Sequence, residues 1–120
     1  MKKQTLGTHI ISEVTNCNPD LLNDEKFLRK LFIKACKFGG AGVISVQSHK
    51  FNPQGVTVLV MLAESHFSCH AWPEYSYAAI DCFTCGKKVK PKKILEYIRE
   101  RLSGSYKTKA IRRGLPKNDL

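Results

Sequence analysis

The sequence predicts an α+β protein, a two-layer sandwich in which a mainly antiparallel sheet carries two helices on one face. Several short segments alternate apolar and polar residues, as strands with one solvated face do. Two longer segments repeat apolar residues at three- and four-residue spacing, which is typical of amphipathic helices. Most of the strand-like segments follow one another through short turns, and this favours antiparallel pairing. At 120 residues without an internal repeat, the chain is expected to form a single domain over 1–120.

The first half of the chain predicts a strand, a helix and a hairpin. Residues 7–14 are rich in β-forming residues and make the first strand. A helix follows, with Asn23 as its N-cap and Gly39 at its end. Its apolar stripe consists of Phe27, Leu28, Leu31, Phe32, Ala35 and Cys36. Residues 43–51 and 56–63 then form neighbouring antiparallel strands, because the turn residues Asn, Pro, Gln and Gly separate them.

The second half predicts two more strands, a helix and a final strand. Residues 66–71 and 75–84 are strands separated by a Trp-Pro-Glu turn. Pro91 suits the first turn of a helix that ends at Gly104. The stripe of this helix is Ile94, Leu95, Ile98 and Leu102. Residues 105–113 add a last strand and 114–120 a loose tail. The face of the sheet without helices is solvated or covered by a second subunit.

Composition limits the cellular setting. Hydrophobic residues make up 42% and charged residues 25% of the chain, which is ordinary for a soluble globular protein. No apolar run approaches the roughly 20 residues that span a bilayer, and the basic N-terminus lacks the apolar region of a signal peptide. We therefore expect a cytoplasmic protein. Its five cysteines, an odd number, are expected to be free thiols.

The net charge of +10 is concentrated in the last third of the chain. Residues 87–120 hold twelve Lys and Arg against three acidic residues, whereas 1–86 hold eight against seven. A solvated helix face and tail is the ordinary explanation. The alternative is a nucleic-acid or acidic-membrane partner, and we expect neither.

Residues 64–74 hold more reactive side chains than any other stretch, directly after the apolar run 56–63. In a strand, even spacing places His66, Ser68 and His70 on one face, with Phe67 and Cys69 on the other. Ser65 beside two histidines suggests a serine hydrolase, but no G-x-S-x-G elbow surrounds it. The stretch predicts an active site without deciding its chemistry.

Cys82 and Cys85 form a CxxC pair whose chemistry is also open to more than one interpretation. A zinc site would need two further ligands, which His66 and His70 could supply. However, residues three apart in a strand face opposite sides of the sheet. A thioredoxin-like redox pair would need a helix to begin here, and none is predicted. We expect no metal.

The peptide from Leu62 to Glu74 closely resembles the signature of pyruvoyl-dependent S-adenosylmethionine decarboxylases of the short bacterial and archaeal type. The similarity extends to residues 77–86, to 49–56 and to 7–13. It implies a proenzyme in which the Ser65 hydroxyl attacks the Glu64 carbonyl and forms an ester. Elimination would then cut the chain into a β chain, 1–64, and an α chain, 65–120. Ser65 would become a pyruvoyl group, the covalent cofactor.

The resemblance also implies which residues act in processing and in turnover. His70 matches the proton acceptor of the elimination, and Thr57 stands where the family has a serine that supports ester formation. The pyruvoyl carbonyl derived from Ser65 would form a Schiff base with the substrate amine and serve as an electron sink. Cys85 matches the proton donor to the α-carbon, a role that suits a thiol of tunable pKa.

Substrate contacts follow from the same resemblance. Glu74 matches a carboxylate that binds the ribose hydroxyls, and Phe51 an aromatic ring that stacks on adenine. Glu13 and Glu64 match acidic positions near the site. In the family the site lies at the interface of a homodimer, so Phe51 and Glu13 would act on a different subunit from Ser65. The product would be carbon dioxide and the aminopropyl donor for spermidine synthesis.

Two alternatives compete with this interpretation. Related pyruvoyl enzymes decarboxylate arginine or ornithine, but such substrates have no use for the ribose and adenine contacts of Glu74 and Phe51. An inactive module that binds nucleic acid through the basic tail belongs to a different class, and it predicts an uncut chain. One departure from the family pattern is Thr8, where an arginine is common.

Overall fold

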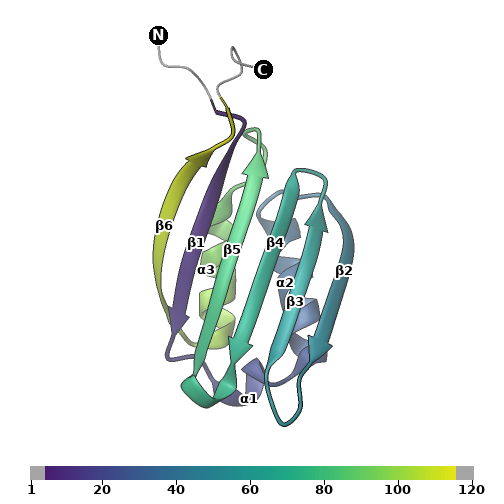
Figure 1. The fold of residues 1–120 in the computed structure, drawn as a ribbon, viewed down its shortest axis with the longest axis vertical. Coiled ribbons are helices and arrows are strands. Elements are labelled where there is room, and N and C mark those ends of the chain that lie inside the picture. Colours follow the sequence, from purple (N-terminus) through teal and green to yellow (C-terminus); the bar gives the residue numbers. More distant parts are fainter. Residues whose placement is uncertain (1–4, 116–120) are drawn as a thin grey trace.

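The computed structural model describes residues 5–115 as a six-stranded antiparallel sheet with its helices on one face (Figure 1). The strands are β1 (Gly7–Thr15), β2 (Val43–Lys50), β3 (Val56–Leu62), β4 (Ser65–Trp72), β5 (Tyr77–Cys85) and β6 (Ser105–Arg113). Their order across the sheet is β2-β3-β4-β5-β1-β6. The helices are α1 (Pro19–Leu22), α2 (Glu25–Phe38) and α3 (Pro91–Leu102), with a 3-10 turn η1 (Pro73–Tyr75). The predicted fold class is confirmed.

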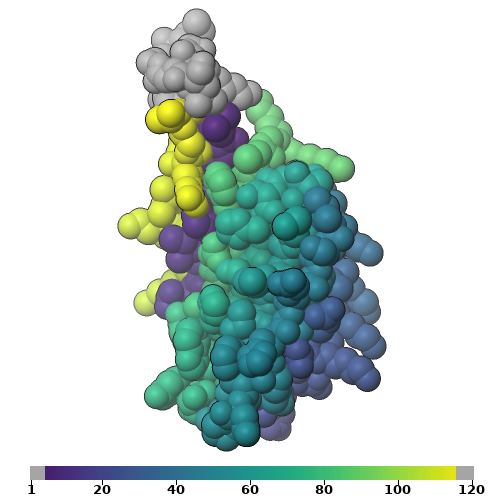
Figure 2. Space-filling model, turned by 45° about the vertical axis from the view of Figure 1, so that its right-hand side comes forward, coloured from purple at the N-terminus to yellow at the C-terminus, as the bar shows by residue number. Residues whose placement is uncertain are grey.

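All six predicted strands and both predicted long helices are present, with ends that differ by at most two residues. Most of the predicted tail, 116–120, lies outside the described residues. Within the described part of the chain, no helix combines the length and apolar character that a bilayer span requires. β6 forms a narrow strip at the edge of the molecule beside β1, as the space-filling view shows (Figure 2).

The predicted N-cap of the long helix is wrong by one residue. Asp24, not Asn23, caps α2 and accepts the backbone N–H of Phe27 at 2.9 Å. Asn23 instead ends α1, a one-turn helix that the sequence analysis did not predict, and its side-chain oxygen accepts the Gly55 N–H at 3.1 Å. This tertiary hydrogen bond ties the α1–α2 corner to the β2–β3 turn.

The core lies between the helix layer and the sheet. The buried stripe of α2 faces the inward residues of β3 and β4, and the rings of Phe32 and Phe67 lie 5.0 Å apart. α3 packs beside α2, where Gly39 leaves room for Ile94 because any Cβ at this position would collide with that side chain. The two predicted apolar stripes are therefore confirmed as core.

Among residues 5–115, no helix lies on the other face of the sheet, and we call it the open face (Figure 1). Along β4, Phe67 and Cys69 are buried while His66, Ser68 and His70 point to the open face, as predicted. Ala71 and Trp72 continue the same alternation. Large apolar side chains on this face are 39–56% exposed: Ile11, Leu59, Met61, Trp72 and Ile111. An exposed apolar surface of this kind is typical of a protein–protein contact.

Candidate active site

The corner between Glu64 and Ser65 is held by three hydrogen bonds. Gly42 accepts the Ala63 N–H at 2.7 Å and donates its own N–H to Glu64 Oε1 at 3.0 Å. The backbone N–H of Cys85 donates to the Glu64 carbonyl oxygen at 3.0 Å. The two-residue turn between β3 and β4 therefore holds the Glu64 carbonyl against a hydrogen-bond donor.

Ser65 has a backbone conformation that L-residues rarely adopt. Its φ is +148°, at the first position of β4, where it pairs with the buried Thr84 of β5. Such conformations cost about 1–3 kcal/mol and persist where the surrounding structure fixes them. A strained hydroxyl residue directly after a polarised carbonyl suits an attack of that hydroxyl on the carbonyl carbon. The residues present therefore fit the formation of a pyruvoyl group at Ser65.

Cys85 is the exposed thiol next to this corner, at the end of β5. The other four cysteines are buried and free, as predicted for the whole set. Burial raises the pKa of Cys82 to about 12 and that of Cys17 to about 11. Because Cys82 points into the core while Cys85 is exposed, the two do not share a face, as predicted for a strand.

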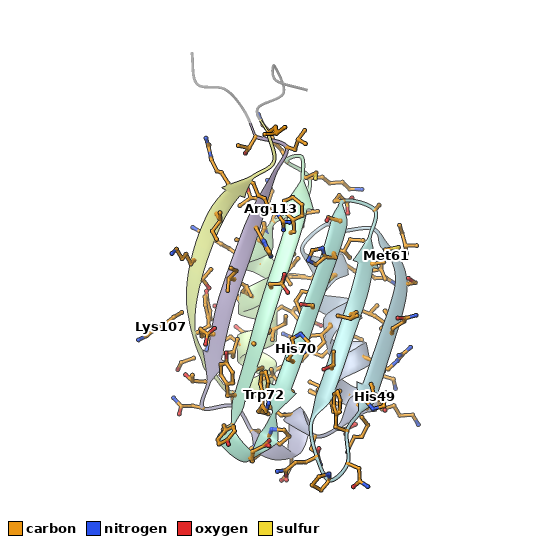
Figure 3. The ribbon with its side chains drawn as sticks, viewed as in Figure 1. His49, Met61, His70, Trp72, Lys107 and Arg113 are labelled. Atoms are coloured by element: carbon orange, nitrogen blue, oxygen red, sulfur yellow. The ribbon has the colours of Figure 1, made fainter. Side chains whose placement is uncertain are left out.

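Thr57 and His70 form a second group at the other end of the open face. Thr57 Oγ1 and His70 Nδ1 lie 3.1 Å apart across β3 and β4, and the His70 ring lies 6.2 Å from that of Trp72. A hollow of about 330 Å³ is lined by both residues together with Phe51, Trp72 and Glu74. The structure thus brings four of the predicted site residues together. Of these, His70 is labelled in Figure 3, in the lower half of the sheet beside Trp72.

Glu13 lies on the same row of the open face. It pairs with Ala79, which pairs with His70 on the far side of β5. Two strand spacings, about 10 Å, therefore separate Glu13 from His70. The Tyr77 hydroxyl donates to Glu13 Oε2 at 2.6 Å. Burial, together with this hydrogen bond to a carboxylate, raises the pKa of Tyr77 to about 12.

The two groups do not meet within one chain. Ser65 and His70 are five residues apart on the same strand, which corresponds to about 16 Å. The corner group, Glu64, Ser65 and Cys85, therefore occupies one end of the sheet. The other predicted residues occupy the opposite end. Within the described residues, each end is an incomplete site.

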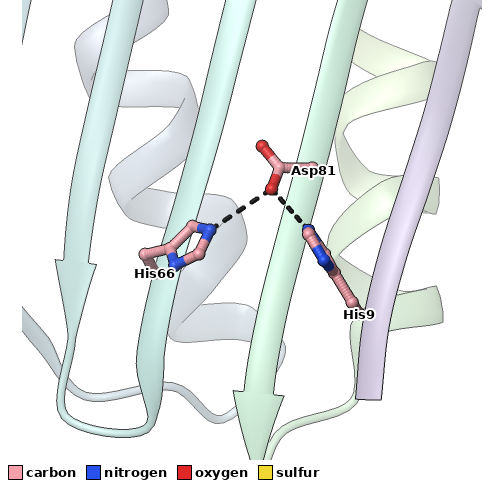
Figure 4. A group of neighbouring side chains, drawn as sticks. All are labelled: His9, His66 and Asp81. Atoms are coloured by element: carbon pink, nitrogen blue, oxygen red, sulfur yellow. Dashed lines mark hydrogen bonds and ion pairs between the residues drawn. The ribbon is translucent and has the colours of Figure 1, made fainter. Parts of the chain in front are cut away.

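A cluster that the sequence analysis missed lies near the corner group. Asp81 on β5 contacts His9 Nε2 at 2.6 Å and His66 Nε2 at 3.2 Å through one carboxylate oxygen (Figure 4). Its other oxygen accepts a hydrogen bond from Ser68. The alternation of polar residues could have indicated that His66 and Asp81 point to the open face. The contact with His9, 72 residues away in the chain, carries no local signal.

Comparisons with known proteins point to one family. A family model described as S-adenosylmethionine decarboxylase matches residues 8–114. A protein of Caldicellulosiruptor saccharolyticus named S-adenosylmethionine decarboxylase proenzyme is 43% identical over 111 residues, covering 92% of this chain and 90% of that protein. A protein of the same name from Brevibacillus brevis is 47% identical over 98 residues, covering 82% and 74%. The crystal structure of the adenosylmethionine decarboxylase from Aquifex aeolicus superposes with a TM-score of 0.87 at 32% identity, over 95% of each chain.

Proposed function

The chain belongs to the S-adenosylmethionine decarboxylase family, and we propose that it cuts itself between Glu64 and Ser65 and then decarboxylates S-adenosylmethionine. The observation that carries this proposal is the strained Ser65 placed after a carbonyl that the Cys85 N–H polarises. The names of the relatives do not favour arginine or ornithine as the substrate.

In the first step of cleavage, Ser65 Oγ attacks the Glu64 carbonyl carbon. The C–O ester bond forms, the C–N peptide bond breaks, and the hydroxyl proton passes to the Ser65 nitrogen. The Cys85 N–H, 3.0 Å from the carbonyl oxygen, stabilises the negative charge that develops there. Relief of the strained Ser65 backbone favours this step.

In the second step, His70 removes the α-proton of Ser65 and the Glu64 carboxylate departs as the new C-terminus. Loss of ammonia and addition of water leave a ketone at residue 65. For His70 to act through Nε2, its Nδ1–H must donate to the Thr57 hydroxyl, 3.1 Å away. Thr57 thus sets the tautomer and orientation of the base.

We propose that His70 comes from a second copy of the chain. The two groups of site residues lie at opposite ends of the sheet, so an antiparallel stacking of two open faces places each His70 at the end of the partner's sheet where Ser65 lies. A two-fold axis generates both sites at once, because the same surface serves each subunit. The exposed Leu59, Met61 and Trp72 supply apolar area for this contact. The functional form is then a homodimer with two shared sites.

The same pairing assembles the substrate site. Phe51, 48% exposed, offers its ring to adenine, and the exposed Glu74 offers two acceptors to the ribose hydroxyls. Glu13 lies on the same row of the sheet as His70, and its negative charge attracts the positively charged sulfonium of the substrate. The Glu64 side chain is held by Gly42 and keeps the new C-terminus beside the site.

A pyruvoyl group at residue 65 supplies an electron sink for the pair released when carbon dioxide leaves the substrate. The chain's own contribution is a proton, which the Cys85 thiol delivers to the α-carbon from the end of β5. The resulting product carries the aminopropyl group used in polyamine synthesis.

Release of carbon dioxide from carboxyl-labelled substrates tests the activity. Purified protein should release label from S-adenosylmethionine and not from arginine or ornithine. Ser65→Ala is the matched control and should release none. Release from an amino acid alone would contradict the proposed substrate.

A further inference from the structure

The His9–Asp81–His66 cluster is a directed chain of hydrogen bonds across four strands. Arg113 of β6 donates from Nη1 to His9 Nδ1 at 3.3 Å, and its guanidinium also lies 4.9 Å from the centre of the Phe83 ring. Because arginine only donates, Nδ1 of His9 is the acceptor and its proton lies on Nε2. His9 then donates that proton to Asp81, 2.6 Å away.

The direction of these hydrogen bonds decides against a metal ion as the occupant. Two histidines and a carboxylate with their ligand atoms within 4.8 Å could in principle hold one. A neutral histidine that binds a metal through Nε2 carries its proton on Nδ1 and needs an acceptor there. The guanidinium of Arg113 offers His9 no acceptor. The cluster is therefore better suited to fixing side chains than to binding a cation.

The end of this chain of hydrogen bonds lies at the cleavage site. His66 directly follows Ser65, and Asp81 holds it at 3.2 Å while also accepting a hydrogen bond from Ser68. Asp81 pairs with Ser68 in the register of β4 and β5, and Ser65 pairs with Thr84 three residues further on. Asp81 thus fixes both residues of β4 that lie closest to the strained position on the open face.

Asp81 is suited to this task in its ionised form. Burial disfavours the charge, but the hydrogen bonds from Ser68, His9 and His66 outweigh it and lower the pKa of the carboxyl. A carboxylate accepts hydrogen bonds on two oxygens, whereas an amide side chain has only one acceptor oxygen and an NH2 group that donates. The Asp81 side chain therefore stays charged and keeps its three partners at neutral pH.

We propose that Asp81 is a positioning residue for self-cleavage: through His66 and Ser68 it holds the start of β4 so that the Ser65 hydroxyl faces the Glu64 carbonyl. This inference rests on the proposed function, because it concerns the same cleavage. It assigns to Asp81 the ester-forming step, whereas His70 serves the elimination.

Hydroxylamine separates these two steps, because it attacks an ester at Glu64 and cuts the chain without the elimination. Freshly refolded precursor would be followed with and without hydroxylamine on denaturing gels. In His70→Ala the ester should form, so hydroxylamine should cut a chain that does not cut itself. In Asp81→Asn both kinds of cleavage should slow by about ten- to a hundred-fold, the effect of misplacing reacting groups. Asp20→Asn, which changes an exposed carboxylate on α1, is the matched control and should behave as the unaltered chain.

The outcomes distinguish the inference from the function on which it rests. An unaltered chain that is never cut would overturn the proposed function and this inference with it. If the unaltered chain is cut and Asp81→Asn is cut equally fast, only the inference fails. It also fails if hydroxylamine cuts Asp81→Asn at the unaltered rate, because the ester then forms normally.

Two controls test whether Asp81→Asn slows cleavage only because it misfolds or fails to dimerise. Circular dichroism and sedimentation establish whether Asp81→Asn folds and dimerises; a slow variant that is merely monomeric would contradict a positioning role. Should it not fold, His9→Phe removes one donor to Asp81 while keeping an aromatic ring of similar size. His9→Phe should slow both kinds of cleavage to a smaller extent, and cleavage at the unaltered rate would overturn the inference.

Discussion

Thr57 and His70 face each other across β3 and β4, with Thr57 Oγ1 3.1 Å from His70 Nδ1, at the end of the sheet opposite to Ser65. Thr57 presents its hydroxyl to the histidine across the two strands. The distance along β4, about 16 Å from Ser65 to His70, supports the proposal that the pair serves the Ser65 of a second chain.

A shared site predicts complementation between two inactive variants. Ser65→Ala keeps His70, and His70→Ala keeps Ser65, so a mixed dimer contains one complete site. Neither variant should be cut alone, whereas co-expression should yield cleavage of the His70→Ala chain. Different affinity tags would show that mixed dimers form. Mixed dimers without any cleavage would contradict a site shared between two subunits.

Replacement of the exposed thiol should separate processing from turnover. Cys85→Ser keeps the backbone N–H that donates to the Glu64 carbonyl, so self-cleavage should continue. Loss of the thiol as general acid should reduce carbon dioxide release by about 10²- to 10⁴-fold. Gels and the release assay on the same sample measure both effects. Unchanged release would exclude Cys85 as the proton donor.

The thiols should differ sharply in reactivity toward iodoacetamide. Cys85 is exposed, whereas burial raises the pKa of Cys36 and Cys82 to about 12 and disfavours their thiolates. Mass spectrometry of peptides should find Cys85 alkylated first in the native protein, and the buried cysteines only after unfolding. Cys85→Ser should lack the fast phase. Fast labelling of Cys69 or Cys82 would contradict the described packing.

Asp81 should contribute to stability in a pH-dependent way. Its folded-state pKa lies below the ordinary value of 3.8, so its contribution is present above that pH and is lost as the pH falls through the folded-state pKa. Urea unfolding should show Asp81→Asn to be less stable at neutral pH. The difference from the unaltered chain should shrink as the pH falls below 3.8. A difference in stability that grows toward acid pH would contradict a lowered pKa of Asp81 in the folded state.

Local pattern was sufficient to predict the strands, the two long helices and the inward and outward faces of β4. The error at Asn23 arose because a tertiary contact with Gly55, 32 residues away, competes with capping. The Asp81 cluster could not be predicted for the same reason: it forms because the sheet order places β1 beside β5, a tertiary arrangement without a local sequence signal. The roles of Ser65 and Cys85 came from family resemblance. The strained φ and the hydrogen bond to the Glu64 carbonyl give the role of Ser65 a physical basis, whereas for the Cys85 thiol the structure adds its exposure.

The intact mass of the purified protein tests self-cleavage most directly. The account predicts two chains, 1–64 and 65–120. The second chain should be lighter, by the mass of one ammonia, than a chain 65–120 that begins with an unmodified serine. Ser65→Ala should give one uncut chain of 120 residues. A single uncut chain in the unaltered protein, or an α chain that keeps its N-terminal serine, would contradict the account.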